Sequence, residues 1–199
     1  MASCVVIVAI ICVLFTTVAT IVAFATPNWL AFRGTNDLQL CGCLTCDCGL
    51  WLRCVSSDRN ILKGNLDNCD WFFTNDFYIE RALPDWFKAV QGLLSCAVAS
   101  SLLSLLIGLF SLCCMCKTCN PHQAAGAFIN LTFLLLAVAV CVFGAKAHID
   151  HQVEVVVKDN VIEPLFGWSF WTAVAAATLA LLSSILYFCV GRSNEYQYN

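Results

Sequence analysis

Four long apolar stretches alternate with polar segments along this chain. They cover residues 4–25, 89–116, 123–145 and 164–191, and none of them contains Asp, Glu, Lys or Arg. Since a helix of about 20 residues crosses about 30 Å of hydrocarbon, each stretch is long enough to span a membrane. Lys88 and Lys117 flank the second stretch, Lys146 follows the third and Arg192 follows the fourth. The pattern therefore predicts four transmembrane helices.

The first stretch has a second interpretation, as a cleavable signal peptide. Ala23-Phe24-Ala25 satisfies the small-x-small rule for cleavage. However, the apolar run is long for a signal peptide and no positive charge precedes it. We therefore interpret it as the first membrane helix.

The segments between the apolar stretches predict how the chain is organised as one domain, 1–199. They are a long first loop, a short turn, a second loop and a tail, at residues 26–87, 117–122, 147–163 and 192–199. In the long loop, 36–40 and 50–55 are expected to form strands and 58–68 a turn. Residues 152–157 predict a further strand in the same sheet. The predicted fold is an all-α membrane protein, a left-handed four-helix bundle with a small antiparallel β-sheet built from the two outer loops.

Composition agrees with a membrane protein and excludes several classes of function. Hydrophobic residues make up 60% of the chain and charged residues only 12%, whereas soluble domains carry about 25% charged residues. The formal net charge is −3, and there is no basic run or Gly-rich phosphate loop, so no nucleic-acid partner is expected. No activated-serine motif, metalloprotease helix or cofactor fingerprint is present either. We expect neither an enzyme nor a bound cofactor.

The cysteines indicate the orientation of the chain. Six of the fifteen lie in the long loop, which suits a disulfide-bonded segment in an oxidising compartment. Both termini would then face the cytosol. The two outer loops each carry more Asp and Glu than Lys and Arg. If they line a gap between cells, the excess of negative charge would disfavour anions.

Two clusters of cysteines have more than one interpretation. The first cluster, in the long loop, has C-x-C and C-x-x-C spacings that a soft metal would accept, although outside the cell the same thiols oxidise to extra disulfides. It contains Cys41, Cys43, Cys46 and Cys48. The second cluster lies at the cytosolic end of the second helix, where the thiols are candidates for S-palmitoylation or are free and packed at the helix end. It contains Cys113, Cys114, Cys116 and Cys119. We expect extra disulfides in the first cluster and no metal.

Asn130 is a polar residue at membrane depth in the third apolar stretch. Such residues form hydrogen bonds between helices or mark a functional site. We expect Asn130 to form a hydrogen bond across the bundle.

The long loop carries a motif known from one family of membrane proteins. Its residues are Trp29, Gly49, Leu50, Trp51, Cys54 and Cys69. Together with the four apolar stretches, this motif resembles the W-GLW-C-C signature of the claudin superfamily, which includes peripheral-myelin-like proteins and calcium-channel gamma subunits. Leu83-Pro84 and residues 167–170 are similar to family segments as well. The resemblance implies a disulfide between Cys54 and Cys69, and it implies that Trp29 and Trp51 anchor the sheet onto the bundle.

The same resemblance implies a function. Claudin-like proteins lie at lateral cell–cell junctions of the plasma membrane and form a paracellular barrier, and the resemblance implies that this chain associates with itself or with other claudin-like proteins, in cis and in trans. An alternative is an auxiliary, gamma-like subunit of an ion channel or receptor in the same membrane. A receptor-like role in adhesion or signalling is a third.

Three features depart from the family pattern. Fourteen residues separate Cys54 from Cys69, more than is usual in vertebrate claudins. Gln91 stands where claudins commonly have Arg. The last residue, Asn199, is not the apolar residue that binds PDZ scaffolds, so such a scaffold is not an expected partner. These departures suggest a divergent, invertebrate claudin-like protein and a septate rather than a tight junction.

Overall fold

A computed structural model describes most of the chain. The described residues are 2–33, 41, 45–55, 69–74, 78–113, 121–150 and 165–195. They fall into two compact units, which are described separately below. The first contains Met1–Ile21, Leu93–Val138 and Thr172–Asn199, and the second contains Val22–Gly92 and Ala139–Trp171.

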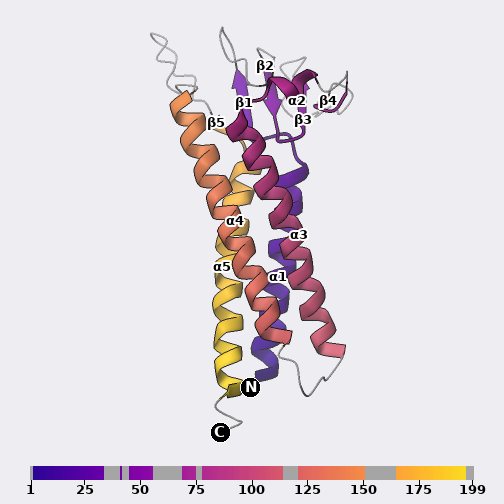
Figure 1. Cartoon of the computed structure of the whole chain (residues 1–199), viewed down its shortest axis with the longest axis vertical. Helices are drawn as coiled ribbons and strands as arrows, with labels where there is room; N and C mark the ends of the chain where they lie inside the picture. The colour runs from indigo at the N-terminus through magenta and orange to yellow at the C-terminus, as the bar shows by residue number, and fades with distance from the viewer. Residues whose placement is uncertain are drawn as a thin grey trace. The chain divides into compact units, whose positions relative to one another are not determined.

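Four long helices dominate the described structure (Figure 1). They are α1 (Ala2–Ala25), α3 (Asp85–Cys113), α4 (Pro121–Asp150) and α5 (Trp168–Glu195), and a short helix, α2 (Tyr78–Ala82), precedes α3. Each long helix contains a span of at least 21 residues that is apolar enough to cross a membrane. The predicted fold class, four membrane helices with a small antiparallel sheet, is confirmed.

Several helix boundaries differ from those predicted, by up to five residues. The second long helix begins at Asp85, before residue 89, and the carbonyl of Pro84 accepts bonds from the backbone N–H groups of its first turn. The third continues to Asp150, beyond the predicted end at residue 145. The fourth begins at Trp168 and not at residue 164, because Leu165–Phe166 form a strand. Apolar runs mark the part of a helix that faces hydrocarbon, whereas the helical backbone bonds continue into polar sequence.

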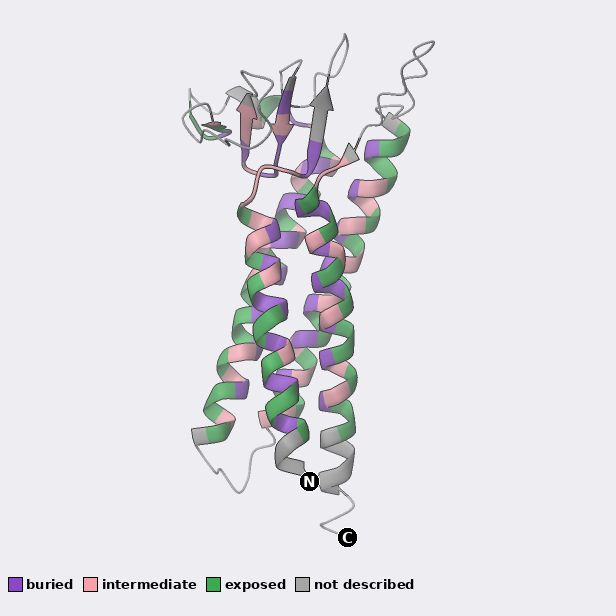
Figure 2. Cartoon of the chain, turned by 180° about the vertical axis from the view of Figure 1, so that it is seen from behind, coloured by how far each residue is buried: buried purple, intermediate pink, exposed green. Residues whose placement is uncertain are grey.

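In the first unit, small residues allow the helices to approach one another closely. Ser104 Oγ of α3 donates to the carbonyl of Ala125 in α4 at 2.8 Å. A Cβ on Gly108 would lie 2.9 Å from the hydroxyl of Tyr187, a residue of α5 that is almost fully buried. Such small-residue contacts are the usual basis of helix packing in lipid. Many large apolar side chains of the long helices are exposed instead, as expected where lipid covers them (Figure 2).

The second unit contains a five-stranded antiparallel sheet in the order β4-β3-β2-β1-β5. Its strands are β1 (Leu30–Arg33), β2 (Thr45–Cys48), β3 (Leu52–Val55), β4 (Cys69–Trp71) and β5 (Leu165–Phe166). Four strands come from the first loop, and β5, which pairs with β1, comes from the segment before α5. Two distant parts of the chain therefore build one sheet.

The predicted strands correspond only partly to the observed ones. The expected strand over 50–55 is β3, which begins at Leu52 because Gly49 and the next two residues form a turn, with the N–H of Gly49 donating to the carbonyl of Leu52 at 2.9 Å. The strand β2 lies within the first cysteine cluster. It was not predicted, because the sequence there has no alternation of apolar and polar residues. The expected strands at 36–40 and 152–157 and the turn at 58–68 lie outside the described residues.

Candidate functional site

A disulfide joins the two motif cysteines across the sheet. Cys54 of β3 and Cys69 of β4 are direct partners in the antiparallel register, and their Cα atoms lie 4.0 Å apart. Their sequence separation is 15 residues. A cross-link that closes a loop of about this length stabilises a fold by about 3 kcal/mol, chiefly by restricting the unfolded chain. The short edge strand β4 is thereby held to β3.

The first cysteine cluster is oxidised in the structure. Cys41 is joined to Cys48, and Cys46 is also disulfide-bonded. The described part of the chain contains no group of three or more His, Cys, Asp or Glu residues arranged to hold a metal. Thiols in disulfides cannot act as thiolate ligands, so for these three residues the structure corresponds to the disulfide interpretation and not to the metal interpretation.

Trp29 lies at the centre of the second unit and is fully buried. Its indole N–H donates to the carbonyl of Ala23, at the end of α1, at 2.7 Å. The centre of its ring lies 4.8 Å from that of Phe143 in α4 and 6.0 Å from that of Phe170 in α5. The backbone of Trp29 also joins the sheet, since its N–H donates to the carbonyl of Cys48. One residue thus connects the sheet to three helix ends.

Gly49 and Leu50 occupy positions without free space. A Cβ on Gly49 would lie 2.5 Å from the Cα of Pro27 and 2.7 Å from the carbonyl oxygen of Thr26, and both neighbours are backbone. Leu50 is fully buried. Only glycine fits at position 49, because this turn lies directly against the segment that leaves α1.

Trp51 has a different environment from Trp29. It is partly buried, with its ring centre 5.1 Å from that of Phe24 in α1 and 5.6 Å from that of Phe73, which follows β4. The ring of Phe73 is itself 43% exposed. Trp51 therefore covers the end of α1 on one side and supports an exposed aromatic ring on the other.

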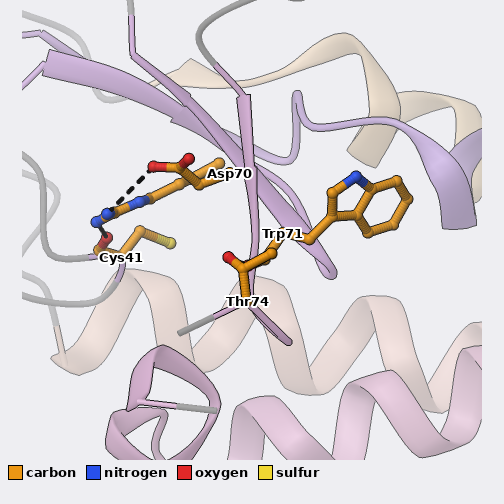
Figure 3. A network of polar contacts seen from close by, with 5 residues as sticks. Cys41, Asp70, Trp71 and Thr74 are labelled. Carbon is orange, nitrogen blue, oxygen red and sulfur yellow. Dashed lines mark hydrogen bonds and ion pairs between the residues drawn. The ribbon is translucent and has the colours of Figure 1, made fainter. Parts of the chain in front are cut away.

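A polar network lies beside the disulfide (Figure 3). Arg53 donates to the carbonyl of Cys41 at 2.8 Å and lies 3.5 Å from a carboxylate oxygen of Asp70. Figure 3 shows the side chain of Trp71 directed away from Asp70, and this ring is 53% exposed. The ion pair is half exposed and contributes little by itself. Its role is to connect β3, β4 and the segment before β2.

Gln91 is a structural residue whose role the sequence did not reveal. It is 3% exposed and lies in α3, and its amide Nε2 donates to the carbonyl of Leu50 at 2.7 Å and to Glu80 of α2 at 3.2 Å. The only signal in the sequence was the presence of Gln where claudins commonly have Arg. Its amide is a hydrogen-bond donor for the Gly49–Trp51 turn, which an arginine side chain would also supply.

We expect Gln91→Met to destabilise the protein by about 1–3 kcal/mol. Methionine has a similar volume but cannot donate, so the buried carbonyl of Leu50 would lose this partner. The measurement is thermal unfolding of the purified protein in detergent. Gln123→Met is the matched control, because Gln123 is exposed on α4. Equal unfolding temperatures for the two variants would contradict this role of Gln91.

The remaining candidate residues are only partly described. Cys113 ends α3, and Cys114, Cys116 and Cys119 lie outside the described residues, as does Cys43. Trp168 is 52% exposed at the start of α5. S-palmitoylation of the second cluster stays a prediction.

Together, the four apolar helices and the disulfide-bonded sheet define a multi-pass membrane protein of the four-helix type. A model of the PMP-22/EMP/MP20/Claudin family matches residues 3–187 of the chain, nearly its whole length. The chain therefore belongs to the PMP-22/EMP/MP20/Claudin family, a family of structural membrane proteins. A search of curated proteins found no match.

Proposed function

We propose that this protein is a structural component of cell–cell junctions and has no enzymatic activity. It would lie in the lateral plasma membrane with both termini in the cytosol, and its sheet would face the intercellular gap. There it would associate with itself or with related proteins, in cis and in trans, to restrict paracellular flow. Family membership and the four membrane helices support this proposal.

The disulfides support the proposed orientation. Cys41–Cys48 and Cys54–Cys69 both lie in the segment between α1 and α3. Disulfides of this kind persist outside the cell and are rare in the cytosol. If this segment is extracellular, the chain crosses the membrane four times and both ends return to the cytosolic side.

The exposed aromatic side chains beside β4 carry the proposal that the sheet mediates association. Trp71 and Phe73 are 53% and 43% exposed, although both lie in the polar segment between two membrane helices. Aromatic residues are enriched at protein–protein interfaces because they bury a large area with little loss of side-chain freedom. The Cys54–Cys69 disulfide holds β4, which ends at Trp71 and is followed two residues later by Phe73, so both rings lie close to a cross-linked strand.

The proposal is tested by imaging tagged protein in junction-free cells, with expressing and non-expressing cells mixed. We expect enrichment only at contacts where both neighbours express the protein. Trp71→Leu should reduce this enrichment several-fold, because it removes an exposed ring without disturbing the disulfide. Trp171→Leu is the matched control, since Trp171 is 60% exposed near the start of α5. Even distribution around every cell would contradict the junction role and favour an auxiliary subunit of a channel or receptor.

A further inference from the structure

Asn130 does not form the predicted hydrogen bond across the bundle. It lies on α4 in the first unit and is exposed, whereas its neighbours Ile129 and Thr132 are fully buried. No other described residue has a side-chain hydrogen bond to its amide in the structure. The expectation was wrong because the 3.6-residue period of the helix turns position 130 to the outer face, one residue beyond the buried stripe.

The amide of Asn130 lies at a depth where lipid cannot hydrogen-bond to it. The apolar span of α4 is Pro121–Ile149, and Asn130 is nine positions from Pro121, or about 13 Å along the helix axis. If about 30 Å of hydrocarbon is centred on this span, the residue lies about 7 Å inside the boundary. An amide exposed there without a partner is costly, because hydrocarbon offers neither donor nor acceptor.

Two other polar side chains of the first unit, Ser100 and Thr178, avoid this cost within the chain. Ser100 Oγ of α3 donates to the carbonyl of Phe128 at 2.7 Å, and the exposed Thr178 of α5 donates to the carbonyl of Ala175 in its own helix at 2.8 Å. A hydroxyl is satisfied by one such bond, whereas the amide of Asn130 has two donor hydrogens and an acceptor oxygen. The contrast singles out Asn130 as a polar group directed at something outside the monomer.

We propose that the outer face of α4 binds α4 of a second copy of this chain in the same membrane, with the two Asn130 amides hydrogen-bonded to each other. The amide carries donor and acceptor together, so two copies related by a two-fold axis satisfy each other reciprocally. Gln123, Ala127, Asn130 and Leu134 are all exposed on this face, at the four-three-four spacing of a helix–helix seam, so Asn130 lies within the seam. The small Ala127 allows close approach beside the amide.

This contact is distinct from association through the sheet and does not depend on the junction role proposed above. It lies in the membrane, involves one helix of each copy and requires both copies to have the same orientation. A single buried Asn in such a seam fixes the register of the two helices, since the amides must meet.

Energy transfer between labelled full-length proteins tests this proposal. Donor- and acceptor-labelled copies are reconstituted together in phosphatidylcholine vesicles over a range of protein-to-lipid ratios. We expect Asn130→Leu to weaken self-association about three- to twentyfold, the range of measured hydrogen bonds between membrane helices. Asn130→Gln should retain association, because it keeps the amide. Thr178→Val should match the wild type, because Thr178 is satisfied within its own helix.

Folding is checked separately by thermal unfolding of each variant at low protein density. Since Asn130 is exposed, Asn130→Leu should leave the unfolding temperature unchanged or raise it. Equal self-association of wild type and Asn130→Leu would overturn the proposal. Wild-type protein that stays monomeric at every density would overturn it as well and point to a different membrane protein as the partner of this face. Neither result bears on enrichment at cell contacts, which tests the junction role.

Discussion

Replacing Cys54 with Ser is expected to remove β4 from the sheet while the four helices remain inserted. The Cys54–Cys69 disulfide holds a strand of only three residues at the edge of a small sheet. Without it the unfolded state regains the freedom of the loop, which costs about 3 kcal/mol of stability. Since β4 presents Trp71, we also expect the variant to lose its enrichment between expressing cells.

The measurement combines thermal unfolding, protease sensitivity of the loop and imaging of cell contacts. Cys69→Ser should behave in the same way, and the double variant should be no worse than either single one, because all three lack the same bond. Cys141→Ser is the control, since Cys141 is a free, exposed cysteine on α4. Normal stability and normal contact enrichment of both single variants would refute a structural role of this disulfide.

The second large effect is expected for Gly49→Ala. The added methyl group would lie 2.5 Å from the Cα of Pro27 and 3.2 Å from the carbonyl oxygen of Leu52, and backbone atoms cannot move aside as a flexible side chain can. We expect a loss of about 1–3 kcal/mol, the usual cost of overpacking. Because the turn also carries Leu50, the bond from Gln91 to its carbonyl should weaken as well.

Thermal unfolding in detergent measures this loss, and the chain provides a matched control. Gly92 of α3 is exposed, and a Cβ there would meet nothing within 4 Å. Gly92→Ala should therefore stabilise the protein by up to about 1 kcal/mol, because alanine favours the helix. The two alanine substitutions are expected to act in opposite directions. A loss of stability in both, or in neither, would show that the tight contact at Gly49 does not matter.

The packing of the motif residues predicts that they tolerate little change. Trp29, Gly49 and Leu50 are each buried, and each connects the sheet to a helix end within the second unit. Gln91 belongs to the same arrangement, although it departs from the residue that claudins commonly have there. The Gly49–Trp51 turn, Trp29 and Gln91 belong to one hydrogen-bonded structure. A substitution at one of them is therefore expected to weaken the hydrogen bonds of the others.

Several features of this protein could be predicted without coordinates. The four helices follow from apolar runs, since any segment of that length must be helical to satisfy its backbone in hydrocarbon. The disulfide between Cys54 and Cys69 was implied by the family motif and is present in the structure. The disulfides of the first cluster followed from the compartment in which the loop is expected to lie.

Other features depended on which residues meet in space. Joining Cys41 to Cys48 is one of several pairings that the spacing allows, and it depends on where the fold places Cys41 relative to Cys48, the last residue of β2. The strand β5 was missed because two residues carry no periodic pattern, and its pairing with β1 is a contact across more than 130 residues of sequence.

The sequence by itself therefore determined the membrane class, the number of membrane helices and the presence of a disulfide-bonded sheet, because the hydrocarbon and the oxidising compartment act on each segment separately. Only the tertiary structure decided which polar groups are satisfied. Gln91 finds the carbonyl of Leu50, a residue distant in sequence, whereas Asn130 turns outward by a fraction of a helical turn. Such outcomes depend on how each helix is rotated about its own axis. Packing against neighbouring helices sets this rotation, and the sequence of a uniformly apolar helix does not show which face is buried.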